Sequence, residues 1–237
     1  MKPVVIAHLY PRDMNIYGDI GNIISLVKRL EWRGFAAEVK AVEPGKPFDF
    51  GKADLVFGGG GQDSGQLVVG EDLLIRATEL RAAANDGVPM LVICGLYQLF
   101  GRGFTTVEGQ EIPGIGVFRA STVGGEARMI GNVIVESTFG QLVGFENHSG
   151  QTILEDGQLA LGRVLKGFGN NPESSQEGAV AGNVIGTYMH GPVLPKNPHL
   201  ADHLLGLALR RRGVTELKPL DDTLEQNAAS VAAGRPQ

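Results

Sequence analysis

The chain has 237 residues, the size of one large domain or two small ones. It carries 21 Lys and Arg against 26 Asp and Glu, and the resulting net charge of -5 argues against nucleic acid or an anionic membrane as the main partner. A single cysteine excludes an internal disulfide, and no apolar run reaches the roughly 20 residues of a membrane-spanning helix. Since the amino terminus has no signal-peptide pattern, we expect a cytoplasmic globular protein.

The first part of the chain alternates buried strands with helices. An almost continuous apolar run at 4–9 predicts a strand covered on both faces. Apolar side chains at helical spacing over 20–30 predict an amphipathic helix that ends before Gly34. Strands are also expected at 36–42, 54–57 and 90–93, with a helix over 73–84. This alternation predicts an α/β fold with a central, largely parallel sheet flanked by helices, and ligands beyond the carboxyl ends of the strands.

The second part of the chain has a different pattern of apolar residues and turns. Short apolar segments separated by glycine turns, from about 101 to 186, predict a β-rich half. Pro198 opens a final helix that ends at Gly213. We therefore expect one domain over 1–213. Residues 214–237 have few apolar side chains and predict a loosely ordered tail, with an interface arm as the alternative.

Cys94 follows the apolar strand 90–93 and precedes Gly95 and a short helical pattern. A cysteine at such a strand-to-helix bend is held at a helix amino terminus, where free N–H groups and the helix dipole favour the nucleophilic thiolate. The alternative is an inert buried cysteine, which position alone favours.

A glycine run, Gly58 to Gly61, follows the strand 54–57 and so lies on the same rim as Cys94. Glycines let backbone N–H groups approach an anion or the oxyanion of acyl transfer. No Lys-Ser/Thr pair follows them, which argues against a phosphate loop, while a plain turn remains the alternative.

A histidine close to Cys94 could act as the base that removes its thiol proton. His190 ends an apolar run and His148 lies in a turn, and the sequence alone does not choose between them. His8 lies inside the first strand. His199 and His203 have a metal-ligand spacing, but Leu200 stands where a metalloprotease needs Glu, so we expect no metal site.

The motifs together resemble a known family. Cys94-Gly95-Leu96-Tyr97-Gln98 with the later His190 is similar to the nucleophile and histidine of class I glutamine amidotransferases. The usual His-x-Glu is here His190-Gly191-Pro192, which resembles the cobyric acid synthase-like subgroup. Within it, the segments 9–11, 17–22, 59–63, 144–150 and 190–198 resemble the glutaminase subunits of lipid II isoglutaminyl synthases.

The resemblance implies a class I glutamine amidotransferase-like fold and a glutaminase activity. Cys94 would attack the side-chain amide of L-glutamine, and His190 would act as base and then as acid. Gly95 and Gly60 or Gly61 would hold the oxyanion. Arg128 would bind the substrate α-carboxylate, and Gln98 would bind substrate or support the bend.

The resemblance also implies a partner, a Mur-ligase-like subunit of the MurT type that forms a heterodimer with this chain. The partner would use ATP and Mg²⁺ to activate the D-glutamate α-carboxylate of lipid II, and ammonia from this chain would convert it to D-isoglutamine for peptidoglycan synthesis. No cofactor is expected in this chain itself. We expect the partner to supply the acidic group missing after His190. The alternatives are a glutaminase for another acceptor, such as a cobalamin precursor, and a non-catalytic scaffold subunit.

Overall fold

Four strands from the first part of the chain and two later strands form a six-stranded sheet with the order β11-β12-β4-β3-β1-β2. The structure is a computed structural model that describes residues 2–61 and 63–235. All neighbouring strands in this sheet are parallel except β11, which pairs antiparallel with β12. The strands of this sheet are β1 (Val4–Leu9), β2 (Ala37–Val42), β3 (Leu55–Gly58), β4 (Met90–Ile93), β11 (Ala179–Ala181) and β12 (Val184–Thr187).

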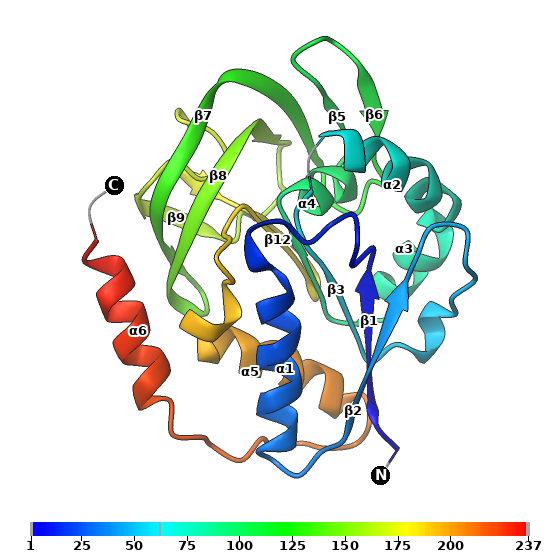
Figure 1. The fold of residues 1–237 in the computed structure, drawn as a ribbon, viewed down its shortest axis with the longest axis vertical. Helices are drawn as coiled ribbons and strands as arrows, with labels where there is room; N and C mark the ends of the chain where they lie inside the picture. Colours follow the sequence, from blue (N-terminus) through cyan, green and yellow to red (C-terminus); the bar gives the residue numbers. More distant parts are fainter. Residues whose placement is uncertain (1, 62, 236–237) are drawn as a thin grey trace.

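Helices cover this sheet, as Figure 1 shows for α1. Every residue of β3, β4 and β12 is buried, as the predicted parallel sheet requires. The α/β fold is therefore confirmed. The helices are α1 (Ile20–Glu31), α2 (Asp63–Ile75), α3 (Ala77–Asn85), α4 (Gly95–Phe100), α5 (Pro198–Arg210) and α6 (Thr223–Ala233), with short 3-10 turns η1 (Ile16–Gly18), η2 (Phe50–Lys52) and η3 (Leu194–Lys196).

The helix expected over 73–84 is interrupted at Arg76, between α2 and α3. The Arg76 side chain is buried, donates to Asp72 at 2.5 Å and reaches the carbonyl oxygens of Glu43 and Lys46. A buried guanidinium must be hydrogen-bonded, and these acceptors satisfy it. The helix is interrupted at the residue that makes these contacts.

A second sheet lies beside the first and has the order β10-β9-β7-β5-β6, with β8 paired to β7. Its main feature is the long antiparallel hairpin of β7 and β8, so the predicted β-rich half is confirmed. The sequence did not predict that β11 and β12 return to the first sheet. The strands of the second sheet are β5 (Gly103–Thr105), β6 (Glu111–Pro113), β7 (Ala120–Ser137), β8 (Gly140–Leu154), β9 (Gly162–Lys166) and β10 (Gln176–Glu177).

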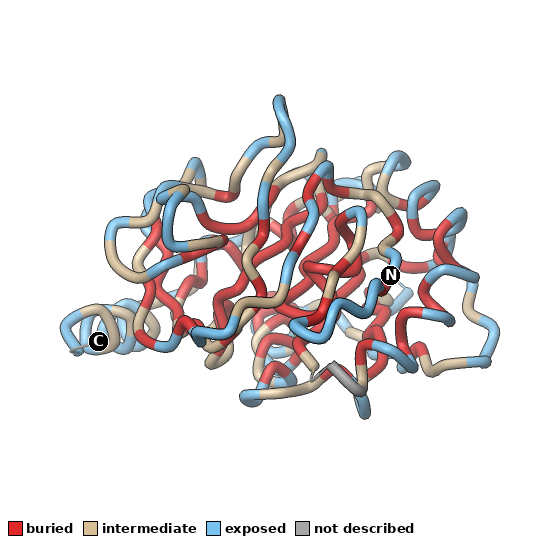
Figure 2. Tube along the Cα trace, turned by 90° about the horizontal axis from the view of Figure 1, so that it is seen from above, coloured by how far each residue is buried: buried red, intermediate tan, exposed pale blue. Residues whose placement is uncertain are grey.

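The carboxyl-terminal segment differs from the loosely ordered tail expected over 214–237. It forms α6, which lies on the outside of the molecule and contacts β7 and β8 (Figure 1). No residue of α6 is buried (Figure 2). Its start is fixed because Arg29 of α1 donates to Asp222 at 2.6 Å, an ion pair 193 positions apart in the sequence that local patterns do not predict.

The carboxyl ends of four adjacent parallel strands meet at one edge of the first sheet. Beyond them lie the loop to η1 after β1, the glycine run after β3, Cys94 after β4 and His190 after β12. This edge is where the sequence places ligands. Among the described residues, no helix has the length and apolar character needed to cross a membrane.

Candidate active site

Cys94 stands at the bend between β4 and α4, as predicted. Its backbone φ is +50°, a conformation that residues other than glycine adopt at a cost. The bend is held because Cys94 N–H donates to the Thr187 carbonyl of β12 at 2.8 Å. The residue is 7% exposed, so the thiol is largely enclosed but retains a face toward a pocket.

His190 is the histidine that the fold brings to Cys94. Its backbone pairs with Phe145 of β8 in both directions, at 3.2 and 2.6 Å, which fixes it where β12 meets the second sheet. Burial by itself lowers the pKa of His190, but the Cys94 thiolate and the Asp19 carboxylate outweigh it and raise this pKa to about 10. The surroundings of His190 therefore favour its protonated form beside the Cys94 side chain.

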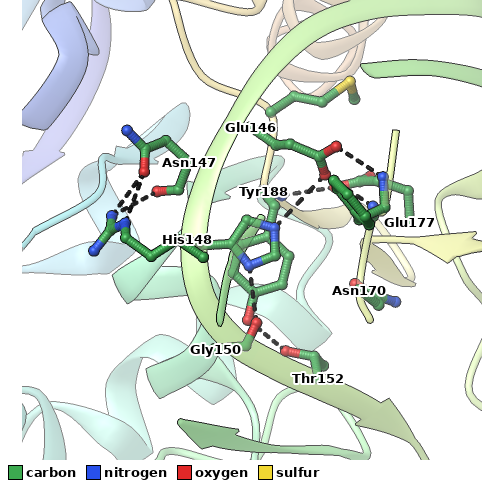
Figure 3. A network of polar contacts seen from close by, with 12 residues as sticks. Glu146, Asn147, His148, Gly150, Thr152, Asn170, Glu177 and Tyr188 are labelled. Atoms are coloured by element: carbon green, nitrogen blue, oxygen red, sulfur yellow. Dashed lines mark hydrogen bonds and ion pairs between the residues drawn. The ribbon is translucent and has the colours of Figure 1, made fainter. Parts of the chain in front are cut away.

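His148, the equal candidate at the sequence level, is held in a different network (Figure 3). Its Nδ1 is 2.8 Å from the Gly150 carbonyl oxygen, and its Nε2 is 3.7 Å from a Glu146 oxygen. Its ring stacks on Tyr188 with the centroids 3.6 Å apart. His148 lines the same pocket as Cys94, but both its ring nitrogens face other groups, so we assign it to the pocket wall.

The glycine run packs against both reactive side chains. A side-chain carbon on Gly60 would lie 2.7 Å from His190 Cε1 and 3.0 Å from Cys94 Cβ. Only glycine therefore fits between them. The Gly60 N–H already donates to Asp19 at 2.8 Å, which leaves Gly61 and Gly95 as the candidate oxyanion donors. Gln62, part of the same motif, lies outside the described residues.

A pocket of about 510 Å³ opens beside Cys94, and both predicted substrate-binding residues line it. Arg128 of β7 is exposed, and its guanidinium donates to Asn147 Oδ1 at 3.0 and 2.8 Å. Gln98 is buried, and its amide accepts from Gln66 and donates to the Tyr188 hydroxyl, each at 3.1 Å. Because both ends of the Gln98 amide are engaged, the contacts favour the supporting role.

Asp19 is a site residue that the sequence analysis did not single out. Its carboxylate Oδ1 lies 3.3 Å from His190 Nδ1, although 171 positions separate the two residues. The available signal was its place beyond the carboxyl end of β1, on the same rim as the glycine run. The chain thus supplies a carboxylate to His190 itself, and a contribution from a partner stays a separate prediction.

The remaining histidines lie elsewhere. His8 is buried in β1. The ring of His203 on α5 packs on the Phe139 ring with the centroids 4.6 Å apart. His199 also lies on α5. Within residues 2–61 and 63–235, no group of three or more His, Cys, Asp or Glu side chains is arranged to hold a metal ion.

The chain is similar in sequence to known proteins. The chain is 39% identical to the Lipid II isoglutaminyl synthase (glutamine-hydrolyzing) subunit GatD of Staphylococcus aureus (strain N315), with 99% of this chain and 97% of the relative covered. It is also 39% identical to the subunit of the same name from Streptococcus pneumoniae (strain ATCC BAA-255 / R6), covering 94% of this chain and 88% of that one.

The fold also matches solved structures. A crystal structure of a glutamine amidotransferase superimposes with a TM-score of 0.59 at 20% identity, covering 88% of this chain and 99% of that one. The family model for the CobB/CobQ-like glutamine amidotransferase domain matches residues 5–198. The chain therefore belongs to the CobB/CobQ-like glutamine amidotransferase family.

Proposed function

We propose that this chain is the glutaminase subunit of a lipid II isoglutaminyl synthase. It would release ammonia from L-glutamine and pass it to a Mur-ligase-like partner that amidates the D-glutamate α-carboxylate of the lipid II stem peptide. The observation that carries the glutaminase assignment is that Cys94 and His190 both pack against Gly60, with Cys94 lining the pocket. The choice of lipid II as acceptor is supported by the two relatives named above.

In the first half-reaction, the Cys94 thiolate attacks the side-chain amide carbon of glutamine. The carbonyl oxygen becomes an oxyanion, for which the Gly61 and Gly95 amides are the candidate donors. The His190 imidazolium gives its proton to the amide nitrogen, the C–N bond breaks, and ammonia leaves a glutamyl thioester on Cys94. The raised pKa of His190 suits this step because the imidazolium begins with the proton that the leaving ammonia needs.

In the second half-reaction, His190 is neutral and removes a proton from water, which attacks the thioester carbon. The C–S bond breaks, glutamate is released, and the Cys94 thiolate and protonated His190 are restored. Arg128 would release Asn147 to bind the substrate α-carboxylate with both arms of its guanidinium.

The partner would carry the ATP and Mg²⁺ that activate the acceptor carboxylate, and this chain would act in the cytoplasm, at the inner face of the membrane, through that partner. Ammonia must then reach the ligase site without loss to solvent. We therefore expect the two subunits to work as a heterodimer.

Transfer of ¹⁵N from the glutamine amide to the stem peptide tests the proposal. The co-purified complex is given ATP, lipid II and glutamine labelled with ¹⁵N at the amide, and the stem peptide is analysed by mass spectrometry. We expect ¹⁵N in D-isoglutamine with the wild-type chain and none with Cys94→Ser, while Cys94→Ser still amidates when ammonium is supplied. Glutamine-dependent amidation by Cys94→Ser would refute the site, and glutamine hydrolysis without lipid II amidation would refute the acceptor. Equal glutaminase rates for the isolated chain and the complex would refute a carboxylate supplied by the partner.

A further inference from the structure

His190 has two ring nitrogens, and the fold uses them differently. Nδ1 lies 3.3 Å from Asp19 Oδ1, and both side chains are fully buried. Nε2 is buried and makes no hydrogen bond to any residue that the structure describes. Nε2 is thus the nitrogen available to the Cys94 sulfur. A carboxylate at Nδ1 favours the proton at that atom and so fixes the tautomer.

The second oxygen of Asp19 is also committed. Oδ2 accepts from the Gly60 N–H at 2.8 Å, and the Gly60 carbonyl accepts from the Ile16 N–H at 3.0 Å. The segment 16–19 therefore holds Gly60 from both sides, while Gly60 packs against His190 and Cys94. The Asp19 carboxylate therefore contacts both the His190 ring and the backbone of the glycine run, and it can fix the position of each.

Few charged groups face the His190 ring. They are the Cys94 thiolate from the bend before α4 and Asp19 from the turn before α1. Tyr17 of η1 packs its ring edge-on against His190 with the centroids 5.0 Å apart. His8 of β1 also feels the Asp19 charge, but burial lowers the pKa of His8 to about 4, so His8 is neutral near pH 7 and does not compete for the carboxylate.

We propose that Asp19 is the positioning residue of this site: it holds His190 in the tautomer that presents Nε2 to Cys94, and it fixes the glycine run beside the reacting carbon. The proposal rests on the proposed glutaminase function and deepens it, because it assigns an orienting carboxylate to this chain, separate from any carboxylate that the partner supplies. The His-x-Glu place two residues after His190 is filled by Pro192, so the orienting carboxylate comes from the β1–α1 turn.

The test compares Asp19→Asn with Asp202→Asn, a matched control. Asp202 makes partly buried ion pairs, with Arg29 and Arg33 at 2.7 and 2.6 Å, but it lies on α5 away from the site. In the complex, Asp19→Asn should lower kcat for glutamine hydrolysis at least about tenfold, since loss of the orienting carboxylate in a serine protease costs about 10⁴-fold. The KM should change little, and Asp202→Asn should keep the wild-type kcat. A wild-type kcat in the Asp19→Asn complex would overturn the proposal.

A second readout needs no glutamine. Cys94 is the chain's single cysteine, so the rate of its alkylation by iodoacetamide can be followed against pH in the isolated chain. Asp19 stabilises the protonated His190 that favours the thiolate, so Asp19→Asn should move the midpoint of the profile upward by at least about 0.5 pH unit. Asp202→Asn should leave the midpoint unchanged even where thermal unfolding shows an equal loss of stability. An unmoved midpoint in Asp19→Asn would contradict the positioning role.

A third readout keeps the proposal testable if Asp19→Asn does not fold. In Cys94→Ser, where no thiolate holds the imidazolium, ¹⁵N NMR of neutral His190 should show the proton on Nδ1. A proton on Nε2 would overturn the proposal. The alkylation and NMR results stand whatever the acceptor is, so they separate a failure of this proposal from a failure of the proposed function.

Discussion

At the scale of single residues, Cys94 combines reactivity with backbone strain. Its φ of +50° and ψ of -107° suit glycine far better than a residue with a Cβ. Such strain costs about 1–3 kcal/mol and persists only where surrounding contacts enforce it. Here the enforcing contact is the hydrogen bond to Thr187.

Because the backbone at Cys94 is strained, replacing this residue with glycine should stabilise the fold while abolishing activity. Cys94→Gly should unfold at higher urea concentration than Cys94→Ala, by about 1 kcal/mol after the larger unfolded-state entropy of glycine is subtracted. Both variants should lack glutaminase activity. If Cys94→Ala proves as stable as Cys94→Gly, the bend is not strained as described.

The residues alone predict Cys94, the resemblance selects His190 over His148, and neither identifies Asp19. The strand, cysteine and glycine of the bend are consecutive, so a local pattern predicts them. The choice between His190 and His148 depends on which one the sheet brings to Cys94, and Asp19 reaches His190 across 171 positions. Such contacts exist only after β1, β4 and β12 lie side by side.

At the scale of elements, the junction between the two sheets depends on Glu177 of β10. Its fully buried carboxylate accepts from the Thr187 hydroxyl at 2.9 Å and from the Tyr188 N–H at 2.7 Å, next to β12. Burial raises the pKa of Glu177 to about 8, against the hydrogen bonds from Tyr188 and Thr187, which lower it. The folded protein therefore binds a proton at Glu177 more tightly than the unfolded chain does.

The free energy of unfolding should consequently decrease as the pH rises from the ordinary glutamate pKa, near 4.5, to about 8. One pKa unit corresponds to about 1.4 kcal/mol, so a loss of about 2 kcal/mol or more is expected between pH 5 and pH 8. In Glu177→Gln the loss should be smaller by about this amount, with the part due to the raised pKa of His190 remaining, while Glu136→Gln, an exposed control on β7, should follow the wild type. Parallel urea-unfolding curves for wild type and Glu177→Gln across this range would contradict the account.

The attachment of α6 gives a second prediction at this scale. Buried Arg29 pairs with Asp202 and with Asp222, the residue that precedes α6. Asp222→Asn should free α6 and cost about 1 kcal/mol, because Arg29 keeps Asp202. Arg29→Met should cost about 3 kcal/mol or more, because both carboxylates lose this partner.

Hydrogen exchange of the α6 amides and urea unfolding measure the two effects separately. Fast exchange confined to α6 is expected for Asp222→Asn, with the central sheet still protected. Slow exchange of α6 in this variant would show that its contacts with β7 and β8 suffice to hold it.

The sequence predicted those elements that carry strong periodic patterns. The strands 4–9 and 90–93 and the helices that begin at Ile20 and Pro198 were placed within a few residues. The break at Arg76 and the helix α6 were not predicted. Both depend on buried arginines whose acceptors lie far away in the sequence, and neither leaves a local apolar pattern.

At the scale of the whole molecule, function follows from the parallel arrangement of four strands. Their carboxyl ends bring the turn before α1, the glycine run, the bend at Cys94 and the end of β12 to one edge. The alternation of strands and helices predicted this edge. The second sheet then closes the pocket through Arg128, which the sequence could assign only by resemblance, and through His148, whose place in the pocket wall was not predicted.

The most direct test is covalent labelling of the purified complex with the glutamine-derived electrophile 6-diazo-5-oxo-norleucine, followed by mass spectrometry of the digested chain. One adduct on Cys94 is predicted, with parallel loss of glutaminase activity and with protection by excess glutamine. Full glutaminase activity with Cys94 labelled, or loss of activity with Cys94 unmodified, would contradict the assignment of this site.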